Sequence, residues 1–492
     1  MNANSGVNYA VKLNENELNL EISTLLKTKS PHNIRLDLIN QGYDEKSVDS
    51  ILHETIRNSK FIKNKNSSIV LFKDFFDKVG YGFSSPLFMY VLLYVLGMPL
   101  IFIGFVGAIK TFLTLFTSSA VKEYNLHIKI HKKFIAHYGT LFGFSFLLMA
   151  LGKSINSSII FSIGILFSSV FVVIHGDLYS TYVMTKLSSA RSHLTSKIIS
   201  YFSLIITAIA FIIAGYFLDF SVITINLFFV KFTIPGYLLV LETVAFAFIL
   251  SSYVFSFVKA EPEIKKEFAF TKKYKNNFWS LYFSDLKKNF SKFFKNHNIK
   301  MLFFGTLFSG AMQTLMSTFA GIYIFTNFQD SIFNKFFYLS LIFGLGILAA
   351  SVGPSITRKF IKIFGETPIL VFGVFLISIF PLSIYFNVSY YALIIAHSVS
   401  VLGASCISVV QSFIVKNSLE EQERQTYFSA ITPILSFLIP VIIIIFSVLI
   451  NYIDFKTIFI IIPMVNILFI TPFYFNLVIK ANKEHFNKNI FS

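Results

Sequence analysis

The chain has 492 residues, of which 54% are hydrophobic and only 14% are charged. Soluble proteins carry about 25% charged residues, so this composition excludes an ordinary soluble protein. The net charge of +17 would suit nucleic-acid binding, but no basic face with its own fold accompanies it, and the single cysteine, Cys406, excludes an intrachain disulfide.

Residues 1–67 are polar and contain no signal-peptide pattern, so we predict an N-terminal cytosolic helical region. Two short amphipathic helices are expected on either side of Gly42, with Asp44 as the N-cap of the second. Their apolar side chains can form a small core of Ile34, Leu38, Val48, Ile51 and Leu52. The pattern resembles a UBA-like module that would dock a cytosolic partner; a plain appendage is the alternative.

Apolar stretches recur after this region, and each is long enough to cross the hydrocarbon core of a membrane as a helix of about 20 residues. The stretches are continuous rather than alternating, which disfavours the strands of a membrane barrel. We therefore predict an all-α integral membrane protein with twelve transmembrane helices, at residues 76–97, 99–120, 134–152, 157–186, 196–219, 234–258, 300–326, 336–357, 367–386, 389–416, 428–450 and 456–479.

The lysines and arginines indicate the orientation of these spans. If both termini lie in the cytosol, the inward connections and the C-terminal tail hold 26 basic residues, against 4 on the outward side. The distribution predicts a multi-pass protein of the cell membrane with cytoplasmic N- and C-termini. It also explains the positive net charge, because the basic side chains would face anionic membrane lipids.

A basic loop at residues 259–299 divides the membrane part into two six-helix bundles, at 76–258 and 300–480, with a cytosolic tail at 481–492. Aromatic residues are mixed with the lysines of this loop. Such a segment can lie along the membrane surface as an amphipathic helix.

Connections at equivalent places in the two halves share a pattern. The segment from Gly353 to Gly365 resembles the short basic loop between the eighth and ninth helices of the major facilitator superfamily, and 121–133 is its longer counterpart, without the family's Gly and Asp. Arg191 and Arg424 stand in the fourth-to-fifth and tenth-to-eleventh loops, where the family usually has an arginine. Residues 76–480 thus resemble a divergent member of this superfamily.

The resemblance implies a secondary active transporter that moves a small solute by alternating access between two six-helix halves. Its expected partners are the solute, a co-transported proton or cation, and membrane lipids, but no nucleic acid. Two alternatives stay open: a flippase or exporter of lipid-linked cargo, and a non-transporting membrane receptor or assembly protein.

Polar residues inside the spans are costly, so each is a candidate for function. In the superfamily the first, fourth, seventh and tenth helices line the cavity, which implies a substrate-binding set of Tyr81, Tyr90, His175, Tyr179, Tyr182, Gln313, Ser317, His397 and Gln411. His175, Tyr179 and Tyr182 share one helix face at i, i+4 and i+7. Hydrogen-bonded helix packing is the alternative interpretation of this set.

Two intramembrane carboxylates, Glu242 and Asp177, are candidates for ion coupling. A structural ion pair with Lys110 is the alternative. We assign four basic residues to structure or gating: Lys110, Arg191, Arg358 and Arg424. Simple retention on the cytosolic side explains the arginines equally well.

Catalytic motifs are missing from the sequence. It contains no Walker loop and no Gly-x-Ser-x-Gly elbow. We therefore expect no enzymatic activity, no cofactor and no metal site.

Overall fold

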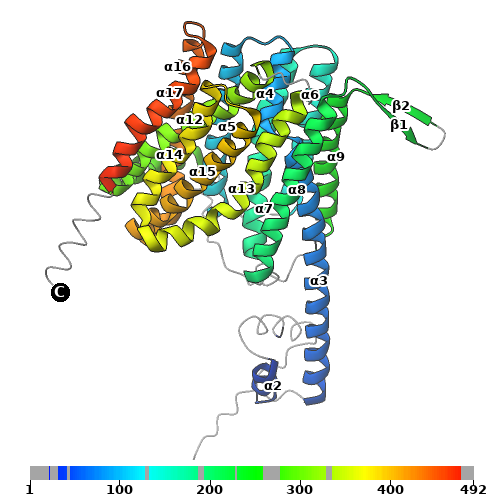
Figure 1. The fold of residues 1–492 in the computed structure, drawn as a ribbon. Helices are drawn as coiled ribbons and strands as arrows, with labels where there is room; N and C mark the ends of the chain where they lie inside the picture. Colours follow the sequence, from blue (N-terminus) through cyan, green and yellow to red (C-terminus); the bar gives the residue numbers. More distant parts are fainter. Residues whose placement is uncertain are drawn as a thin grey trace, which may run out of the picture.

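The computed structural model of the protein describes residues 22, 31–40, 45–127, 132–186, 193–227, 230–258, 278–327 and 335–477. Helices dominate these residues and stand side by side as one bundle (Figure 1). Nine of the described helices are long and apolar enough to cross a membrane individually. The remaining spans are a broken first helix, a shorter apolar helix and a more polar central one, which together confirm the predicted all-α architecture of twelve spans.

The first half consists of α3 (Glu45–Phe83) with α4 (Pro86–Val95), followed by α5 (Leu100–His127), α6 (Lys132–Ser154), α7 (Ser158–Lys186), α8 (His193–Leu218) and α9 (Gly236–Ser256). The second half consists of α12 (His297–Asn327), α13 (Lys335–Phe364), α14 (Glu366–Tyr385), α15 (Tyr390–Ser418), α16 (Glu421–Leu449) and α17 (Ile458–Val465), which continues through a π-helical turn at Asn466–Ile470. We call the end with the α4–α5 and α16–α17 connections the outer end, at the top of Figure 1, and the opposite end the inner end.

The first span differs from the single helix predicted at 76–97. It is broken between Phe83 and Pro86, because proline has no N–H to donate to the carbonyl of Gly82. The residue before a proline avoids the helical region, and Ser85 accordingly has φ −53° and ψ 129°. The break places irregular backbone within the span, which a membrane protein tolerates only where protein or a cavity surrounds it.

The helix α3 extends well beyond the inner end of the bundle (Figure 1). It runs without interruption across residue 67, where the sequence places the end of the cytosolic region. The short helix α2 (Pro31–Asn40) packs against its start, around a cluster of Ile22, Ile34, Leu38, Val48, Ile51 and Leu52. Arg35 Nε donates to Asp49 Oδ1 at 2.6 Å, and this hydrogen bond holds the pKa of Asp49 below its ordinary value.

A β-hairpin is the exception to the helical architecture in the described part of the chain. Strands β1 (Ile223–Leu227) and β2 (Val230–Ile234) pair antiparallel, with Ile225 opposite Phe232. The hairpin joins α8 to α9 and projects sideways from the outer end (Figure 1). The hydropathy pattern did not anticipate it, because these residues lie in a short connection between two spans.

Helix α11 (Phe278–Phe293) forms within the basic loop between the halves. Its apolar side contacts the second half: the Phe290 ring lies 5.8 Å from that of Phe303, and the Phe293 ring 5.7 Å from that of Tyr427. Lys292 Nζ lies 2.6 Å from Glu423 Oε1, at the start of α16. The loop is thus anchored to the protein as well as being suited to the membrane surface.

The two halves meet along α8 with α13, α4 with α12, and α5 with α16. At the outer end, Asp219 follows α8 in the first half, and its two carboxylate oxygens accept hydrogen bonds from the backbone N–H groups of Phe336 (2.8 Å) and Phe337 (2.7 Å). These donors are among the orphan N–H groups at the start of α13, in the second half. One half therefore caps a helix of the other at the outer end.

We predict that Asp219→Ala loosens the outer end. Losing both hydrogen bonds to α13 should raise the population of molecules with separated outer ends by about tenfold. The measurement is the rate at which a thiol reagent labels a cysteine placed at Ser340, which is fully buried beside α8, in protein with Cys406→Ala.

Asp454→Ala is the matched control for this prediction. Asp454 also lies at the outer end, but it caps a turn of its own half by accepting from the backbone N–H of Lys456. Labelling should be unchanged in this control. Equal labelling rates in Asp219→Ala and the unsubstituted protein would refute the prediction that the Asp219 hydrogen bonds hold the outer end together.

Candidate functional site

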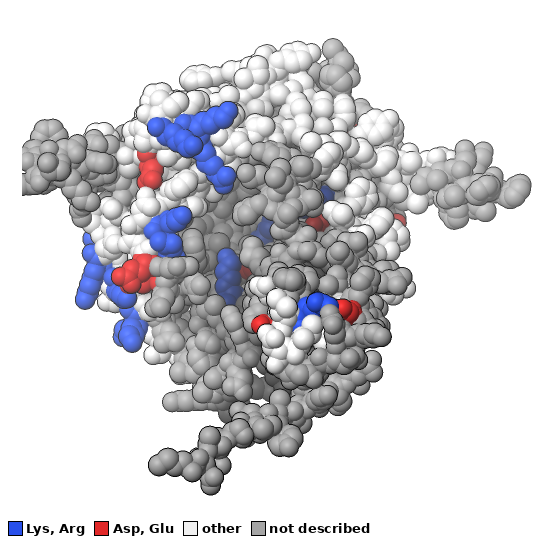
Figure 2. Space-filling view, turned by 90° about the horizontal axis from the view of Figure 1, so that it is seen from below, with Lys and Arg blue, Asp and Glu red and all other residues white. Residues whose placement is uncertain are grey.

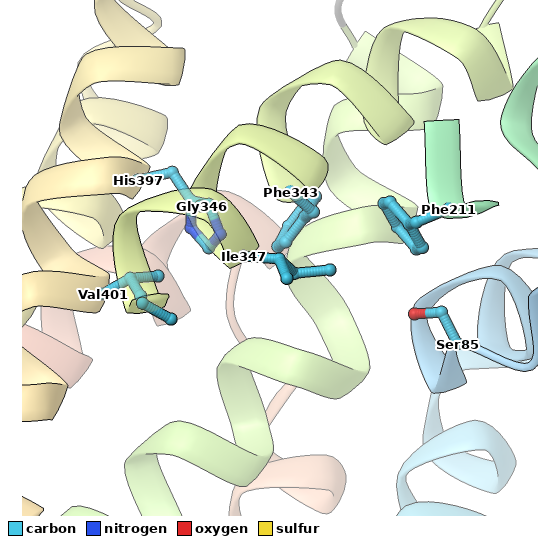
Figure 3. Close-up of a pocket in the computed structure, with 8 residues that line it drawn as sticks. Ser85, Phe211, Phe343, Gly346, Ile347, His397 and Val401 are labelled. Carbon is cyan, nitrogen blue, oxygen red and sulfur yellow. The ribbon is translucent and has the colours of Figure 1, made fainter. Parts of the chain in front are cut away.

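A pocket of about 230 Å³ lies between the two halves. From the first half it is lined by Ser85, at the break in the first span, and by Phe211 of α8. From the second half it is lined by Phe343, Gly346, Ile347 and Ala350 of α13 and by His397 and Val401 of α15. Figure 3 shows His397 and Ser85 on opposite sides of this pocket, with apolar side chains between them.

His397 is the titratable side chain among the residues that line the pocket. Its ring lies 4.4 Å from the Phe343 ring and 4.5 Å from the Phe380 ring. A side chain at Gly346 would overlap the imidazole, so glycine is needed for α13 to approach it this closely. The buried Nδ1 has no hydrogen-bond partner among the described residues, although such a group normally requires one.

Of the nine predicted substrate-binding residues, only His397 lines this pocket. Gln313 and Ser317 lie exposed on one side of α12. Gln411 Nε2 instead donates to the Tyr474 hydroxyl at 2.7 Å and to Thr306 Oγ1 at 3.3 Å, within the second half.

A charge cluster lies buried inside the first half, towards its inner end. Lys73, Asp77 and His175 are 0%, 4% and 1% exposed. Lys73 Nζ donates to Asp77 Oδ2, and the hydroxyl of Ser251 on α9 donates to Asp77 Oδ1. The cluster thus joins α3, α7 and α9 through buried charges that satisfy one another.

The contacts of His175 assign its protons. Nδ1 lies 3.0 Å from the carbonyl oxygen of Ile135, which can only accept, so Nδ1 carries the hydrogen. Nε2 lies 3.2 Å from Lys73 Nζ, which as an ammonium can only donate, so Nε2 offers its lone pair. Asp77 Oδ2 is 3.6 Å from the same Nε2. The arrangement fits a neutral imidazole beside a lysine–aspartate ion pair.

Three of the four predicted tyrosines pack between α3, α7 and α9, the helices that this cluster joins. The Tyr179 hydroxyl donates to Asp74 Oδ1 at 2.6 Å, and Lys73 Nζ stands 3.7 Å from the centre of the Tyr179 ring. Tyr182 is buried with its ring 5.6 Å from that of Phe255. Tyr81 packs 5.1 Å from Phe248. The predicted face of α7 therefore turns towards α3 and α9, within one half.

Sequence reasoning missed Lys73 and Asp77, which belong to none of the predicted sets of functional residues. The available signal was their i, i+4 spacing, which permits an ion pair on one helix face. Spacing does not reveal burial, however, and both residues are buried only because α7 and α9 cover this face of α3.

The second half places a neutral polar cluster on the corresponding helices. Gln411 on the tenth span donates hydrogen bonds to Thr306 on the seventh and to Tyr474 on the twelfth. In the first half, Lys73 and Asp77, His175, and Ser251 stand on the first, fourth and sixth spans. The repeat of the two halves thus preserves the position of a polar cluster but not its charge.

The two predicted ion-coupling residues lie apart. Glu242 is exposed on α9, on the side that also carries exposed Phe246 and Tyr253, and so faces away from the bundle. Asp177 on α7 accepts a hydrogen bond from Ser118 of α5 at 2.9 Å. Neither forms an ion pair with Lys110, whose ammonium lies 5.2 Å from the centre of the Tyr90 ring.

The predicted gating arginines also differ from one another. Arg424 donates to the carbonyls of Leu419 (3.0 Å) and Lys416 (2.7 Å), at the end of α15 in its own half. Arg358 is exposed at the inner end of α13. Arg191 lies outside the described residues. Figure 2, seen from the inner end, shows the described lysines and arginines gathered mainly over the second half.

Comparison with solved structures reveals the same fold in known transporters. The nucleoside transporter NupG matches with a TM-score of 0.63 and 13% identity, over 84% of this chain and 98% of that protein. A POT family transporter in complex with 5-aminolevulinic acid matches with a TM-score of 0.60 and 13% identity, over 85% and 96%. No protein-family profile and no curated protein sequence matches.

We predict that Asp77→Asn lowers the free energy of unfolding by about 3–5 kcal/mol, because Lys73 would remain buried without its counter-ion. The measurement is thermal unfolding of the purified protein in detergent. The double variant Lys73→Met/Asp77→Leu, which removes both charges, should recover most of the loss.

Glu242→Gln is the control, because it removes an exposed carboxylate from the same half and should leave the unfolding temperature unchanged. A single variant Asp77→Asn as stable as the unsubstituted protein would show that the ion pair does not support the fold.

Proposed function

Since the chain has the fold of the major facilitator superfamily, as the sequence predicted, we propose that it is a secondary active transporter of a small solute. In this proposal the two halves rock about a site between them and open it alternately to each side of the membrane. The two hydrogen bonds that join Asp219 of the first half to α13 support a state of this cycle in which the outer end is closed.

The observation that carries the proposal is the pocket between the halves. Both halves line it, as a site with alternating access requires. It combines aromatic walls with two separated polar groups, Ser85 and His397, which is the usual composition of a small-molecule site. The unpartnered Nδ1 of His397 supports a bound solute as its missing partner.

We further propose that transport is coupled to protons through the charge cluster of the first half. Imidazole is the side chain that ordinarily changes charge near neutral pH. Nε2 of His175 accepts a hydrogen bond from Lys73 in the neutral ring. If this nitrogen took up a proton, it would become a donor that faces Asp77. The groups that face this imidazole are Lys73 and Asp77 of α3, Tyr179 of α7, the Ile135 carbonyl of α6 and the Phe248 ring of α9.

For the pocket, we predict that His397→Phe lowers the kcat/KM of uptake at least about tenfold in proteoliposomes. The substitution keeps aromatic packing between Phe343 and Phe380 but removes the hydrogen-bonding nitrogen. Uptake is measured across a panel of labelled nucleosides, peptides, amino acids, sugars and sugar phosphates. His137→Phe, at an exposed histidine on α6, should transport normally. Unchanged uptake by His397→Phe would remove the pocket from the transport path.

For the coupling, we predict that uptake by the unsubstituted protein rises as the pH on the side of solute entry falls, and that His175→Gln abolishes this dependence. Glutamine can still donate to the Ile135 carbonyl and accept from Lys73, so the cluster should remain assembled. Glu242→Gln and Asp177→Asn, measured in parallel, test the carboxylates that the sequence assigned to coupling. A pH dependence lost in either of these variants and kept in His175→Gln would transfer the role to that carboxylate.

A further inference from the structure

Lys110 is a charge in the membrane without a counter-ion. It lies on α5, about 15 Å along the helix from the outer end at Leu100. The four-carbon stem of lysine is too short to carry the ammonium over that distance to water. Within the described residues Lys110 forms no ion pair and no hydrogen bond, and its contact is the face of the Tyr90 ring, 5.2 Å away.

Lys110 lies on the seam, the boundary along which the two halves meet. Gly107 lies one turn of α5 closer to the outer end and packs against the second half, because a Cβ added there would be 3.0 Å from Thr318 Oγ1 of α12. The same Cβ would be 3.5 Å from the Tyr90 hydroxyl of α4. Two residues closer to the inner end, the centre of the Phe112 ring lies 5.1 Å from that of Phe437 on α16. Lys110 therefore stands between two points at which α5 touches the second half, near α4, α12 and α16.

The contrast with Lys73 shows what Lys110 lacks. Lys73 also lies in the membrane part and is fully buried, but Asp77 neutralises it and His175 accepts a further hydrogen bond from it. The ring of Tyr90 offers Lys110 a cation–π contact, which compensates only part of the cost of a charge in hydrocarbon. Charged residues in spans normally pair with one another or line a route for a charged ligand.

We propose that Lys110 binds an anionic group of the transported solute, so that the solute carries a carboxylate or a phosphate. The inference rests on the proposed transport function and extends it to a class of substrate. A lysine is a compact point charge with three donors, which suits a single oxyanion. The anion would supply the counter-ion that the protein itself leaves out, and it would do so at a place that both halves reach.

The test measures binding and uptake with the same panel, using the full chain in detergent and in proteoliposomes. Binding is read as the shift in unfolding temperature on adding each solute: amino acids and peptides as carboxylates, sugar phosphates as phosphates, and their amides, nucleosides and free sugars as neutral counterparts. The three proteins compared are unsubstituted, Lys110→Met and Lys110→Arg. Lys153→Met is the matched control, since Lys153 also lies over a tyrosine ring, that of Tyr237 at 5.7 Å, but near the outer end.

The expected result is that at least one anionic solute stabilises the unsubstituted protein while its neutral counterpart does not. Lys110→Met should lose this shift and raise the KM for that solute about tenfold or more, whereas Lys110→Arg and Lys153→Met should retain both. The carboxylate and phosphate series distinguish which oxyanion is bound. Unliganded Lys110→Met should unfold no earlier than the unsubstituted protein, because it loses no ion pair.

Two outcomes would overturn the proposal: stabilisation by neutral solutes alone, or equal stabilisation of Lys110→Met and the unsubstituted protein by anions. In either case, uptake of a neutral solute would leave the transport function standing. Conversely, binding that depends on Lys110 without uptake of any solute would support the anion site and contradict transport.

Discussion

Hydrocarbon offers no hydrogen bond to a polar group, and this constraint explains where the backbone and the buried charges of the protein lie. The spans are helical because a helix pairs its own backbone. The one break within the first span, at Ser84 and Ser85, borders a pocket inside the protein. Charged groups obey the same constraint: Lys73 and Asp77 enter the membrane part as a pair, and His175 and Ser251 complete their hydrogen bonds.

Two polar groups that lie where the halves meet have no hydrogen-bond or ion-pair partner among the described residues. Nδ1 of His397 is buried without a partner, and Lys110 has an aromatic ring but no counter-ion. Leaving either group without a partner costs free energy. A ligand that supplies a hydrogen-bond partner to His397 or a counter-ion to Lys110 would remove that cost. Their position where the halves meet supports a ligand that binds along the seam.

The two halves repeat a fold but differ in chemistry. The first, fourth and sixth spans carry a charged cluster, whereas the seventh, tenth and twelfth carry the neutral set of Thr306, Gln411 and Tyr474. In our proposal the first half therefore responds to protons, while the seam holds the solute. The hydrogen bonds of Asp219 connect the first half with the pocket, because their donors lie on α13, a helix that lines it.

The sequence by itself determined which segments enter the membrane, because the length and apolarity of a span are local properties. It also identified His175 and His397 as unusual intramembrane groups. Only the tertiary structure decided that Lys73 and Asp77 are buried, that Glu242 faces outwards, and that Asp219 caps a helix of the other half. Helical periodicity says which residues share a face; which neighbour covers that face depends on packing between segments far apart in the chain.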